Sequence, residues 1–417
     1  VAAKAGLKIA LVEKNMAHLG GTCLHNGCIP SKMYLYAAES LLRSHKPYIA
    51  GRLELDMARL DEYKEALLGR STAAIMRQCS DVDLIDSKGE LTAPHTVKTQ
   101  KGKITGRHIV IGTGAKPFIP EGIEYDGIGV ITSDEVLNMQ TLPQKIAVYG
   151  DGAIGLECVS FFAAAGVKSE LIWRHDRLLR RAHPMISQAL NRQLERVGVE
   201  LRPNSRIKTA KTTKRGVHIV FEEGKDHYVP KLLVATGRKA LADAVKISEI
   251  AVNEKGIVTD ENFETTLKEH YAIGDCNGKL QLAHAARAQV LFVVRKILGK
   301  KPQKVVLENV VKFINTIPCS YAQVGKNGKS SGFKESVVPL AGLPFAHIHD
   351  ADDGVMVTYA DEEGFFAGAE IFAPNAQELI SAAAMALAGE MDSATMMRTV
   401  LAHPTFSESF ERSYTRL

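Results

Sequence analysis

Short apolar runs alternate with longer stretches of helical spacing along the first two thirds of this 417-residue chain. Each apolar run predicts a buried strand, and these strands cover residues 8–13, 108–111, 145–149, 169–173 and 232–234. Helical stretches are predicted at residues 32–44, 56–79 and 156–165, with a short β-rich passage at 82–99. Strands that alternate with helices in this way predict α/β units with parallel sheets.

The pattern changes after about residue 306. β-rich passages at residues 310–316, 354–359 and 365–371 alternate there with Ala- and Met-rich helices at 377–388 and 393–401. The Ala/Met stripe is typical of packing or of a subunit interface rather than of a cofactor site. Earlier in the chain, the phrase IVIGTG before residue 115 recurs as LVATGR before residue 239, which suggests two related domains. The predicted fold class is therefore α/β, with two Rossmann-like nucleotide-binding domains and an α+β C-terminal domain.

A glycine-rich loop gives the second Rossmann-like domain its candidate site. The run GDGAIG, with Gly150, Gly152 and Gly155, follows a predicted strand and precedes a predicted helix. Glycines at this spacing allow a tight turn, close approach to a pyrophosphate, and close packing of helix on strand. The helix N-terminus adds amide groups and a favourable dipole for the anion. The motif alone is weak, but its strand–loop–helix setting favours a dinucleotide site.

The next strand ends in WRHDRLLR at residues 173–180, and this sequence bears on which nicotinamide cofactor binds. An NAD site places an acid here to bond the ribose 2′-hydroxyl. This chain has Trp173 instead, and Arg174 and Arg180 can embrace a 2′-phosphate. The sequence therefore favours NADP(H); a solvated basic turn is the alternative.

The first predicted strand, residues 8–13, ends in Glu13. In a dinucleotide-binding fold such an acid follows a G-x-G-x-x-G loop by about 20 residues and bonds the adenosine ribose. Here the acid is present without the loop. We therefore expect a chain that is truncated by one strand and one glycine-rich turn; a different fold without such a loop is the alternative.

Two cysteines in the run GGTCLHNGCIPSK, residues 20–32, carry the most specific chemical signal. Cys23 and Cys28 are too far apart for a C-x-x-C motif, and no second ligand pair suggests a metal. One helical turn with Gly27 can bring the sulfurs together. Pro30 suits the first turn of a helix, so Cys28 lies near a helix N-terminus that favours a thiolate. The spacing predicts a redox-active pair; a static disulfide is the alternative, disfavoured because the chain carries no secretory signal.

The composition is that of an ordinary globular protein, with 45% hydrophobic and 24% charged residues. The net charge of +5 is not concentrated in a basic stripe with interleaved aromatic residues, so nucleic acid is not expected as a partner. No apolar run has the length of a membrane span. The remaining four cysteines are scattered, which fits the cytoplasm or another reducing compartment.

The cysteine run resembles the redox-active disulfide motif of the flavin-dependent pyridine nucleotide–disulfide oxidoreductases, in the form that dihydrolipoyl dehydrogenases carry. His25 departs from it, because that family usually has Asn there. The turn at residues 173–180 is similar to that of glutathione reductase, an NADPH enzyme of the same superfamily. The sequence YAIGD at residues 271–275 and LAHAA at 282–286 resemble the second flavin-binding motif, and AHPTFSE at 402–408 resembles the family's terminal motif.

This resemblance implies three domains and two cofactors. Residues 1–117 with 245–304 would form an FAD-binding domain, 118–244 an NAD(P)-binding domain, and 305–417 the dimerisation domain. Asp275 would bond the ribityl chain of the flavin. The expected cofactor-binding residues are Glu13, Gly21, Thr22, Lys32, Thr113, Gly114, Gly150, Gly152, Gly155, Arg174, Arg180, Gly237, Gly274, Asp275 and Ala283.

The resemblance also implies the roles of the catalytic residues. Cys28 would face the flavin as a thiolate, and Cys23 would exchange with the substrate disulfide. In a homodimer with shared active sites, His403 of one chain would move protons for its partner, oriented by Glu408. Lys32 and Glu157 would form an ion pair beside the flavin.

Three functions remain open from the sequence. The first is a dihydrolipoyl dehydrogenase-like enzyme that acts on a small dithiol or on a lipoyl domain, which the cysteine run and Leu-Ala-His at residues 282–284 favour. The second is an NADPH-dependent reductase of glutathione or of another small disulfide, which Arg174 and Arg180 favour. The third is a non-catalytic homologue, suggested by the missing loop.

Overall fold

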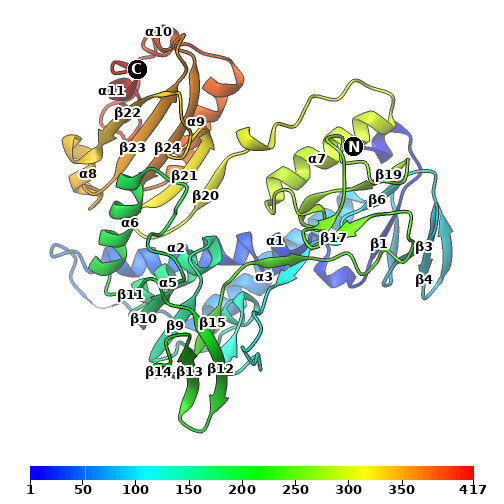
Figure 1. The fold of residues 1–417 in the computed structure, drawn as a ribbon, viewed down its shortest axis with the longest axis horizontal. Coiled ribbons are helices and arrows are strands. Elements are labelled where there is room, and N and C mark those ends of the chain that lie inside the picture. The colour runs from blue at the N-terminus through cyan, green and yellow to red at the C-terminus, as the bar shows by residue number, and fades with distance from the viewer. Residues whose placement is uncertain (52) are drawn as a thin grey trace. The chain divides into compact units, whose positions relative to one another are not determined.

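The chain folds into two compact units, seen in a computed structural model that describes residues 1–51 and 53–417 (Figure 1). The first unit comprises residues 1–30, 62–118 and 238–307. The second comprises residues 31–61, 119–237 and 308–417. This division assigns residues 31–61 to the second unit, although the sequence analysis placed them in the expected FAD-binding domain. The boundaries of the three expected domains stay a prediction.

The first unit contains parallel strand pairs, small antiparallel sheets and helices. Its strands are β1 (Ala10–Glu13), β2 (Asp83–Asp86), β3 (Glu90–Ala93), β4 (Thr96–Thr99), β5 (Gly102–Thr105), β6 (Ile109–Ile111), β7 (Ala115–Pro117), β16 (Arg238–Ala240), β17 (Val252–Asn253), β18 (Gly256–Ile257) and β19 (His270–Ala272). Its main helices are α1 (Gly21–His25), most of α3 (Met57–Gln78), and α7 (Ala283–Ile297). β1 pairs in parallel with β2, and β6 in parallel with β19.

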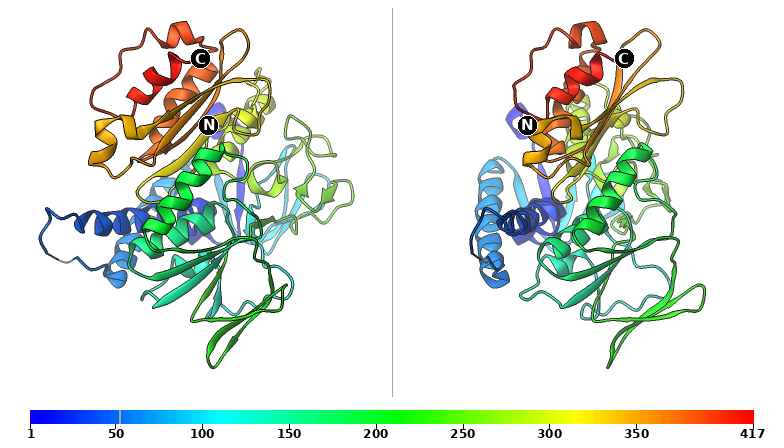
Figure 2. Two further views of the ribbon diagram at one scale, coloured as in Figure 1. Left: turned by 60° about the vertical axis from the view of Figure 1, so that its left-hand side comes forward. Right: turned by 90° about the vertical axis from the view of Figure 1, so that its left-hand side faces the viewer.

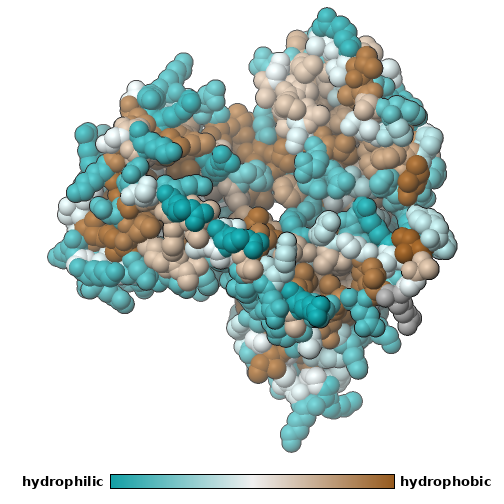
Figure 3. Space-filling view, turned by 180° about the vertical axis from the view of Figure 1, so that it is seen from behind, coloured by the Kyte–Doolittle hydropathy of each residue, from teal (hydrophilic) through white to brown (hydrophobic). Residues whose placement is uncertain are grey.

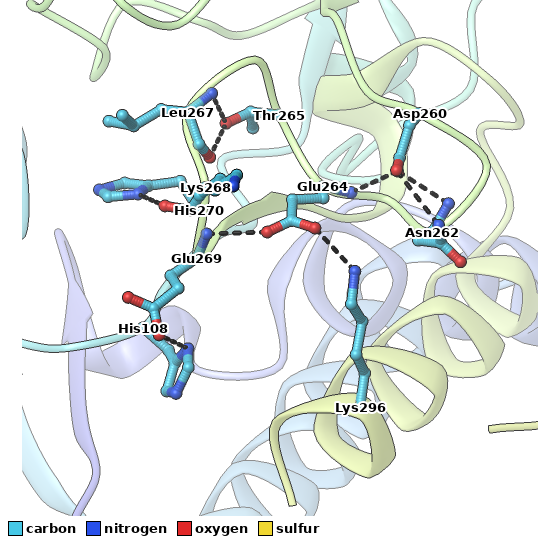
Figure 4. Close-up of polar contacts among 10 residues, drawn as sticks. All are labelled: His108, Asp260, Asn262, Glu264, Thr265, Leu267, Lys268, Glu269, His270 and Lys296. Carbon is cyan, nitrogen blue, oxygen red and sulfur yellow. Dashed lines mark hydrogen bonds and ion pairs between the residues drawn. The ribbon is translucent and has the colours of Figure 1, made fainter. Parts of the chain in front are cut away.

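A network of charged groups fastens α7 to the loop that leads into β19. The carboxylate of Glu264 accepts hydrogen bonds from Lys296 Nζ on α7 at 2.7 Å and from the Glu269 amide at 2.8 Å (Figure 4). Asp260 accepts from the amide of Glu264 at 2.9 Å. These bonds fix the entry to β19, which runs directly into the Gly274 turn.

The second unit contains a five-stranded parallel sheet in the order β11-β10-β9-β15-β8 and a three-stranded antiparallel sheet, β12-β13-β14. The strands are β8 (Val130–Ile131), β9 (Lys145–Tyr149), β10 (Lys168–Ile172), β11 (Glu200–Arg202), β12 (Ile207–Thr213), β13 (Gly216–Phe221), β14 (Asp226–Val229) and β15 (Leu232–Val234). Its helices here are most of α2 (Cys28–Ser44, whose first three residues belong to the first unit), α4 (Ser133–Val136), α5 (Ala153–Ala164) and α6 (Pro184–Arg196). β9 is buried on both faces, as its unbroken apolar run predicts.

An antiparallel sheet completes the second unit, in the order β20-β21-β24-β23-β22. Its elements are β20 (Lys312–Ile314), β21 (Ser320–Gly325), β22 (Lys334–Pro339), α8 (Pro344–Ile348), β23 (Val355–Ala360), β24 (Phe366–Ala373), α9 (Ala376–Ala388), α10 (Ser393–Met396) and α11 (Glu408–Tyr414). Helix α9 packs on β21 and β24, and α11 on β22 and β23. Helix α6 contacts both β11 and β24, so it lies between the two large sheets of this unit (Figure 2).

The buried carboxylate of Glu370 joins these parts of the second unit. It accepts hydrogen bonds from the hydroxyls of Tyr321 at 2.7 Å and Tyr359 at 2.8 Å. The amides of Gly328 and His183 also donate to it, and His183 caps α6. Burial raises the pKa of Glu370. The four donors offset the cost of placing this carboxylate in the core.

Large apolar side chains also remain exposed, and Figure 3 shows hydrophobic residues interspersed among hydrophilic ones on one face. Val400 is 94% exposed and Met385 is 70% exposed, and both belong to the Ala/Met-rich part of the chain. Among the described residues, none of the helices is long and apolar enough to cross a membrane.

The predicted pattern of strands and helices is largely confirmed. β9 matches residues 145–149, and α2, α3, α5 and α9 lie where helices are predicted. The helix predicted at 393–401 is wrong in length, because α10 ends at Met396. The strands β12–β14, β21 and β22 were not predicted. β12–β14 form consecutive antiparallel hairpins, whereas β21 pairs with the more distant β24, which local periodicity does not report.

Candidate active site

The two cysteines lie in consecutive helices rather than on one helical turn. Cys23 belongs to α1, which ends before Asn26, and Cys28 is the first residue of α2. Gly27 sits in the break: a Cβ there would come within 2.8 Å of the Thr22 carbonyl oxygen and 3.3 Å of the Cys23 Cα. The expectation that one helical turn holds both cysteines is therefore wrong. The helix is interrupted between Cys23 and Cys28, where Gly27 lies too close to the Thr22 carbonyl for a side chain.

Cys28 is exposed, and Cys23 is partly buried. Cys28 opens a helix of 17 residues, and Pro30 is the third residue of that helix, in its first turn as predicted. The positive end of the helix dipole therefore points at Cys28, which favours its thiolate. The same backbone arrangement places Lys32 one turn further along, on the same helix face as Cys28.

Lys32 and Glu157 form an ion pair with a distance of 2.5 Å between Nζ and Oε1. The same oxygen of Glu157 accepts the backbone amide of Asn315 at 2.9 Å. The side chain of Lys32 is 32% exposed and that of Glu157 14%, so solvent screens the pair only partly. Beside them, burial raises the pKa of the Cys158 thiol to about 12, which makes that sulfur unreactive.

The three glycines of the loop at residues 150–155 each have a separate structural reason. Gly150 has φ 126°, and a Cβ there would meet the Ala235 carbonyl oxygen at 2.3 Å. A Cβ on Gly155 would meet the carbonyl oxygen of Gly150 at 1.9 Å. Gly152 caps α5 and has no atom within 4 Å of its would-be Cβ, so this helix end is open to an anion. The cradle fits a pyrophosphate.

The basic turn after β10 differs in one respect from the sequence expectation. Trp173 is 2% exposed, so its side chain points into the core and does not face a ribose. The exposed residues of the turn are Arg174, Asp176 and Arg180. Burial, Arg180 and Arg174 lower the pKa of His175, while Asp151 of the glycine-rich loop opposes them. The two arginines are therefore close to one ring, in the electrostatic range of that loop.

A third cation at this turn was missed by the sequence reasoning. Arg206 also acts on His175, although it lies beyond β11. No local motif predicts a role for Arg206, because only the tertiary fold brings residue 206 near residue 175.

The turn after β19 contains Gly274 and Asp275, which the sequence analysis expects to bind the flavin. Gly274 has φ 70°, and its amide donates to the buried Gln289 Oε1 at 2.8 Å. Burial raises the pKa of Asp275, and Arg238 opposes that shift. A half-buried carboxylate in this position fits a ligand that donates hydroxyl hydrogen bonds. Ala283 opens α7, a 15-residue helix whose N-terminus lies a few residues further on.

Most of the other residues expected to bind the flavin nucleotide belong to the same compact unit, whereas Gly237, expected only as a cofactor-binding residue, belongs to the second unit. Glu13 ends β1 and accepts the amide of Asn15 at 3.1 Å, and Thr113 Oγ1 donates to the Leu241 carbonyl at 2.5 Å. The three glycines Gly21, Gly114 and Gly237 have φ angles of 71°, 75° and 128°, and no atom lies within 4 Å of a Cβ built on any of them. The side chain of Thr22 is exposed. Together with Asp275, these residues fit FAD.

The C-terminal motif forms a hydrogen-bonded dyad. The Nδ1 atom of His403 lies 2.7 Å from Glu408 Oε1, and the amide of Thr405 donates to Glu408 Oε2 at 2.9 Å. The bonds from His403 and Thr405 lower the pKa of Glu408. An ionised carboxylate only accepts, so Nδ1 carries a hydrogen, and Nε2 of the neutral imidazole has a lone pair that can accept a proton. The imidazole is 74% exposed and can take a proton from an approaching thiol.

Comparison with known families decides the classification. Residues 1–289 match the model of the pyridine nucleotide-disulphide oxidoreductases. Residues 320–414 match the dimerisation domain of the same proteins. The chain belongs to this family. Its members depend on FAD and a pyridine nucleotide, and a redox-active disulfide centre fits the family.

Curated relatives agree with this membership along nearly the whole chain. The chain is 29% identical to dihydrolipoyl dehydrogenase of Bacillus subtilis, covering 98% of this chain and 92% of that protein. It is 30% identical to dihydrolipoyl dehydrogenase of Chlorobaculum parvum, with 98% and 91% covered. A mercuric reductase of Bacillus cereus is also 30% identical, covering 97% of this chain and 67% of that protein.

Solved structures share the fold. The HOCl-induced flavoprotein disulfide reductase RclA of Escherichia coli superposes with a TM-score of 0.87 at 25% identity, covering 99% of this chain and 95% of that one. LpdA of Mycobacterium tuberculosis gives a TM-score of 0.90 at 22% identity, with 100% and 95% covered. The predicted α/β class with a C-terminal dimerisation domain is thereby confirmed. The main functional expectation, a dithiol/disulfide oxidoreductase like the dihydrolipoyl dehydrogenases, fits these relatives.

Proposed function

We propose that this family member is a dihydrolipoyl dehydrogenase-type enzyme, which oxidises a small dithiol or a lipoyl domain through Cys23 and Cys28. The observation that carries the proposal is the position of Cys28, exposed at the start of α2 and one turn before the Lys32–Glu157 pair. The identity to dihydrolipoyl dehydrogenases over 98% of the chain supports the same substrate class.

The cysteine pair performs thiol–disulfide exchange. A thiolate of the substrate attacks the Cys23 sulfur of the Cys23–Cys28 disulfide, and Cys28 leaves as a thiolate that the helix dipole stabilises. The second substrate thiolate then displaces Cys23 from the mixed disulfide, so that the substrate leaves oxidised and the two cysteines are reduced. When bound, the flavin supplies the two-electron chemistry that links this dithiol with the nicotinamide.

His403 moves the proton that these exchange steps require. Its Nε2 takes the proton of the attacking thiol and returns it to the Cys23 sulfur when that sulfur leaves. Glu408 holds the Nδ1–H tautomer and stabilises the imidazolium that forms. In the homodimer that we propose, this dyad serves the cysteine pair of the partner chain, as its place in the dimerisation domain supports.

We further propose that the nicotinamide is NADP(H). Arg174 and Arg180 are exposed beside His175, and Trp173 stands at the place where a ribose-binding acid is expected. This basic turn also supports the second candidate, an NADPH-dependent reductase of glutathione or another small disulfide. The scattered cysteines favour the cytoplasm or another reducing compartment as the location.

Steady-state turnover separates these functions. The flavin-loaded protein is assayed with dihydrolipoamide and NAD(P)+, and in reverse with lipoamide or oxidised glutathione and NAD(P)H. We expect turnover with the lipoyl compounds to exceed that with glutathione. A preference for oxidised glutathione would favour the second candidate, an NADPH-dependent disulfide reductase. No turnover by flavin-loaded protein with any of these substrates would favour a non-catalytic homologue.

A further inference from the structure

Three aromatic rings pack together beneath the loop that carries the His403–Glu408 dyad. The rings of Phe345 and His349 have centroids 4.5 Å apart, and both contact the ring of Phe406, at 5.0 Å and 5.4 Å. The interplanar angles with Phe406 are 62° and 65°, an edge-to-face arrangement that favours attraction between rings. We call these three residues the ring cluster.

The ring cluster anchors a loop whose first residues, 402–404, are exposed. His403 is 74% exposed, whereas Phe406, three residues later, is only 7% exposed. The neighbour of Phe406 is Thr405, whose amide holds Glu408 and whose hydroxyl donates to the Ala402 carbonyl at 2.7 Å. Burying Phe406 therefore fixes the backbone that orients both members of the dyad.

His349 is itself held from two sides. It caps the C-terminus of α8, and its amide donates to the Ala346 carbonyl at 3.1 Å. The next residue, Asp350, forms an ion pair with Lys46, shortly after the end of α2. Burial and the charges of Arg43 and Lys46 lower the pKa of His349, so a neutral ring packs against the two phenylalanines.

We propose that His349 is a positioning residue for the His403–Glu408 dyad, acting through Phe406. The inference rests on the proposed function of that dyad as the acid–base group. His349 is no proton carrier in this account. Its ring keeps the loop at residues 402–408 in the one arrangement in which Nε2 of His403 faces an incoming thiol.

The test compares three variants of the flavin-loaded protein. His349→Ala removes the ring, His349→Phe keeps it without a titrating group, and His347→Ala is the matched control, because that exposed histidine on α8 bonds only the Ala341 carbonyl among the described contacts. Reduction of the enzyme by dihydrolipoamide is followed by stopped flow. We expect His349→Ala to slow it by about 10- to 100-fold, as a small misplacement of a catalytic group does. His349→Phe should recover most of the rate with an unchanged pH profile, and His347→Ala should match the wild type.

A double variant separates positioning from a general loss of folding. If His349 acts through the dyad, His349→Ala causes no further loss in a His403→Gln background. Additive losses, or a pH profile that changes in His349→Phe, would overturn the inference. If His349→Ala does not fold, His349→Leu replaces it and should show a smaller loss in the same direction.

The same experiment distinguishes the proposed role of the dyad from the positioning role of His349. A His403→Gln variant with a wild-type rate of dihydrolipoamide reduction would overturn the proposed role of the dyad. A slow His403→Gln variant beside a His349→Ala variant as fast as His347→Ala would overturn only the positioning role of His349.

Discussion

Lys32 and Glu157 lie 2.5 Å apart, and the Asn315 amide shares the same carboxylate oxygen. Because Glu157 is 14% exposed, removal of Lys32 leaves a mostly buried carboxylate that still accepts the Asn315 amide. We expect Lys32→Met to lower the free energy of unfolding by about 1–3 kcal/mol. Glu157→Gln should cost less, because an amide oxygen still accepts from Asn315.

Chemical denaturation of the two variants measures this difference. Arg43→Met is a suitable control, because Arg43 lies on the same helix and pairs with Glu39 at the surface. An equal decrease in the free energy of unfolding for Lys32→Met and Arg43→Met would show that the Lys32–Glu157 pair stabilises the protein no more than a surface ion pair.

The cysteines should differ sharply in reactivity. In the reduced protein without flavin, we expect alkylation by iodoacetamide at pH 7 to modify Cys28 before Cys158, because Cys28 is exposed at a helix N-terminus. Cys158, whose pKa is raised to about 12, should stay unmodified until the protein unfolds. Peptide mass mapping over time checks the order. Modification of Cys158 before Cys28 would contradict this account of the site.

His403→Gln should separate the two half-reactions. Reduction by dihydrolipoamide should fall by about two orders of magnitude or more, the usual contribution of a general base. Hydride transfer from the nicotinamide should remain nearly intact, because His403 takes no part in it. Stopped-flow measurement of each half-reaction checks this. Mixed dimers with Cys28→Ser subunits should recover some activity if the sites are shared, and an equal loss of both half-reactions would make His403 a structural residue.

The arginines of the basic turn should set cofactor preference. Each charge-assisted hydrogen bond to a 2′-phosphate contributes about 1.5–3 kcal/mol. We therefore expect Arg174→Ala with Arg180→Ala to raise the KM for NADPH by roughly an order of magnitude or more and to leave that for NADH nearly unchanged. Arg181→Ala, an exposed neighbour, is the control. A wild-type enzyme that uses NADH more efficiently would make a conventional NAD-linked enzyme the better account.

Stability of the first unit should depend on pH through His270. Its Nδ1–H bonds the Lys268 carbonyl at 2.8 Å, and its Nε2 accepts the His95 amide at 3.3 Å, so the buried ring is neutral. Burial lowers its pKa below the ordinary value of about 6.5. The unfolded state therefore binds the proton more readily, and stability falls as the pH drops below about 6.5. Thermal unfolding at pH 5.5 and 7.5 should show this for wild type and for a His45→Asn control, and less for His270→Asn.

Local signals in the sequence predicted the nucleotide loop and the cysteine run well. Gly155 is required by a contact inside the loop, with the carbonyl oxygen of Gly150, whereas Gly150 is required by the Ala235 carbonyl after β15. Helix α2 also begins as the sequence predicts, with Cys28 at its N-terminus and Pro30 in its first turn. The start of α2 and the contact of Gly155 depend on residues close together in the chain.

Contacts between distant segments escaped the sequence analysis. Trp173 occupies the position of an expected acid but turns inward, because the core between β10 and its neighbours accepts its ring. The charge of Arg206 acts on His175, and Phe406 packs against His349, only through the tertiary fold. No periodicity or motif reports such pairs. The roles of these residues could therefore be inferred only once the fold was known.

The claim at the centre of this account is that Cys23 and Cys28 form a redox-active pair whose Cys28 thiolate lies against the flavin. Anaerobic titration of the flavin-loaded protein with dithionite or NAD(P)H tests it most directly. We expect a long-wavelength thiolate–flavin absorption band in the wild type, absent in Cys28→Ser. Flavin-loaded wild-type protein that takes up electrons without any such band would contradict it.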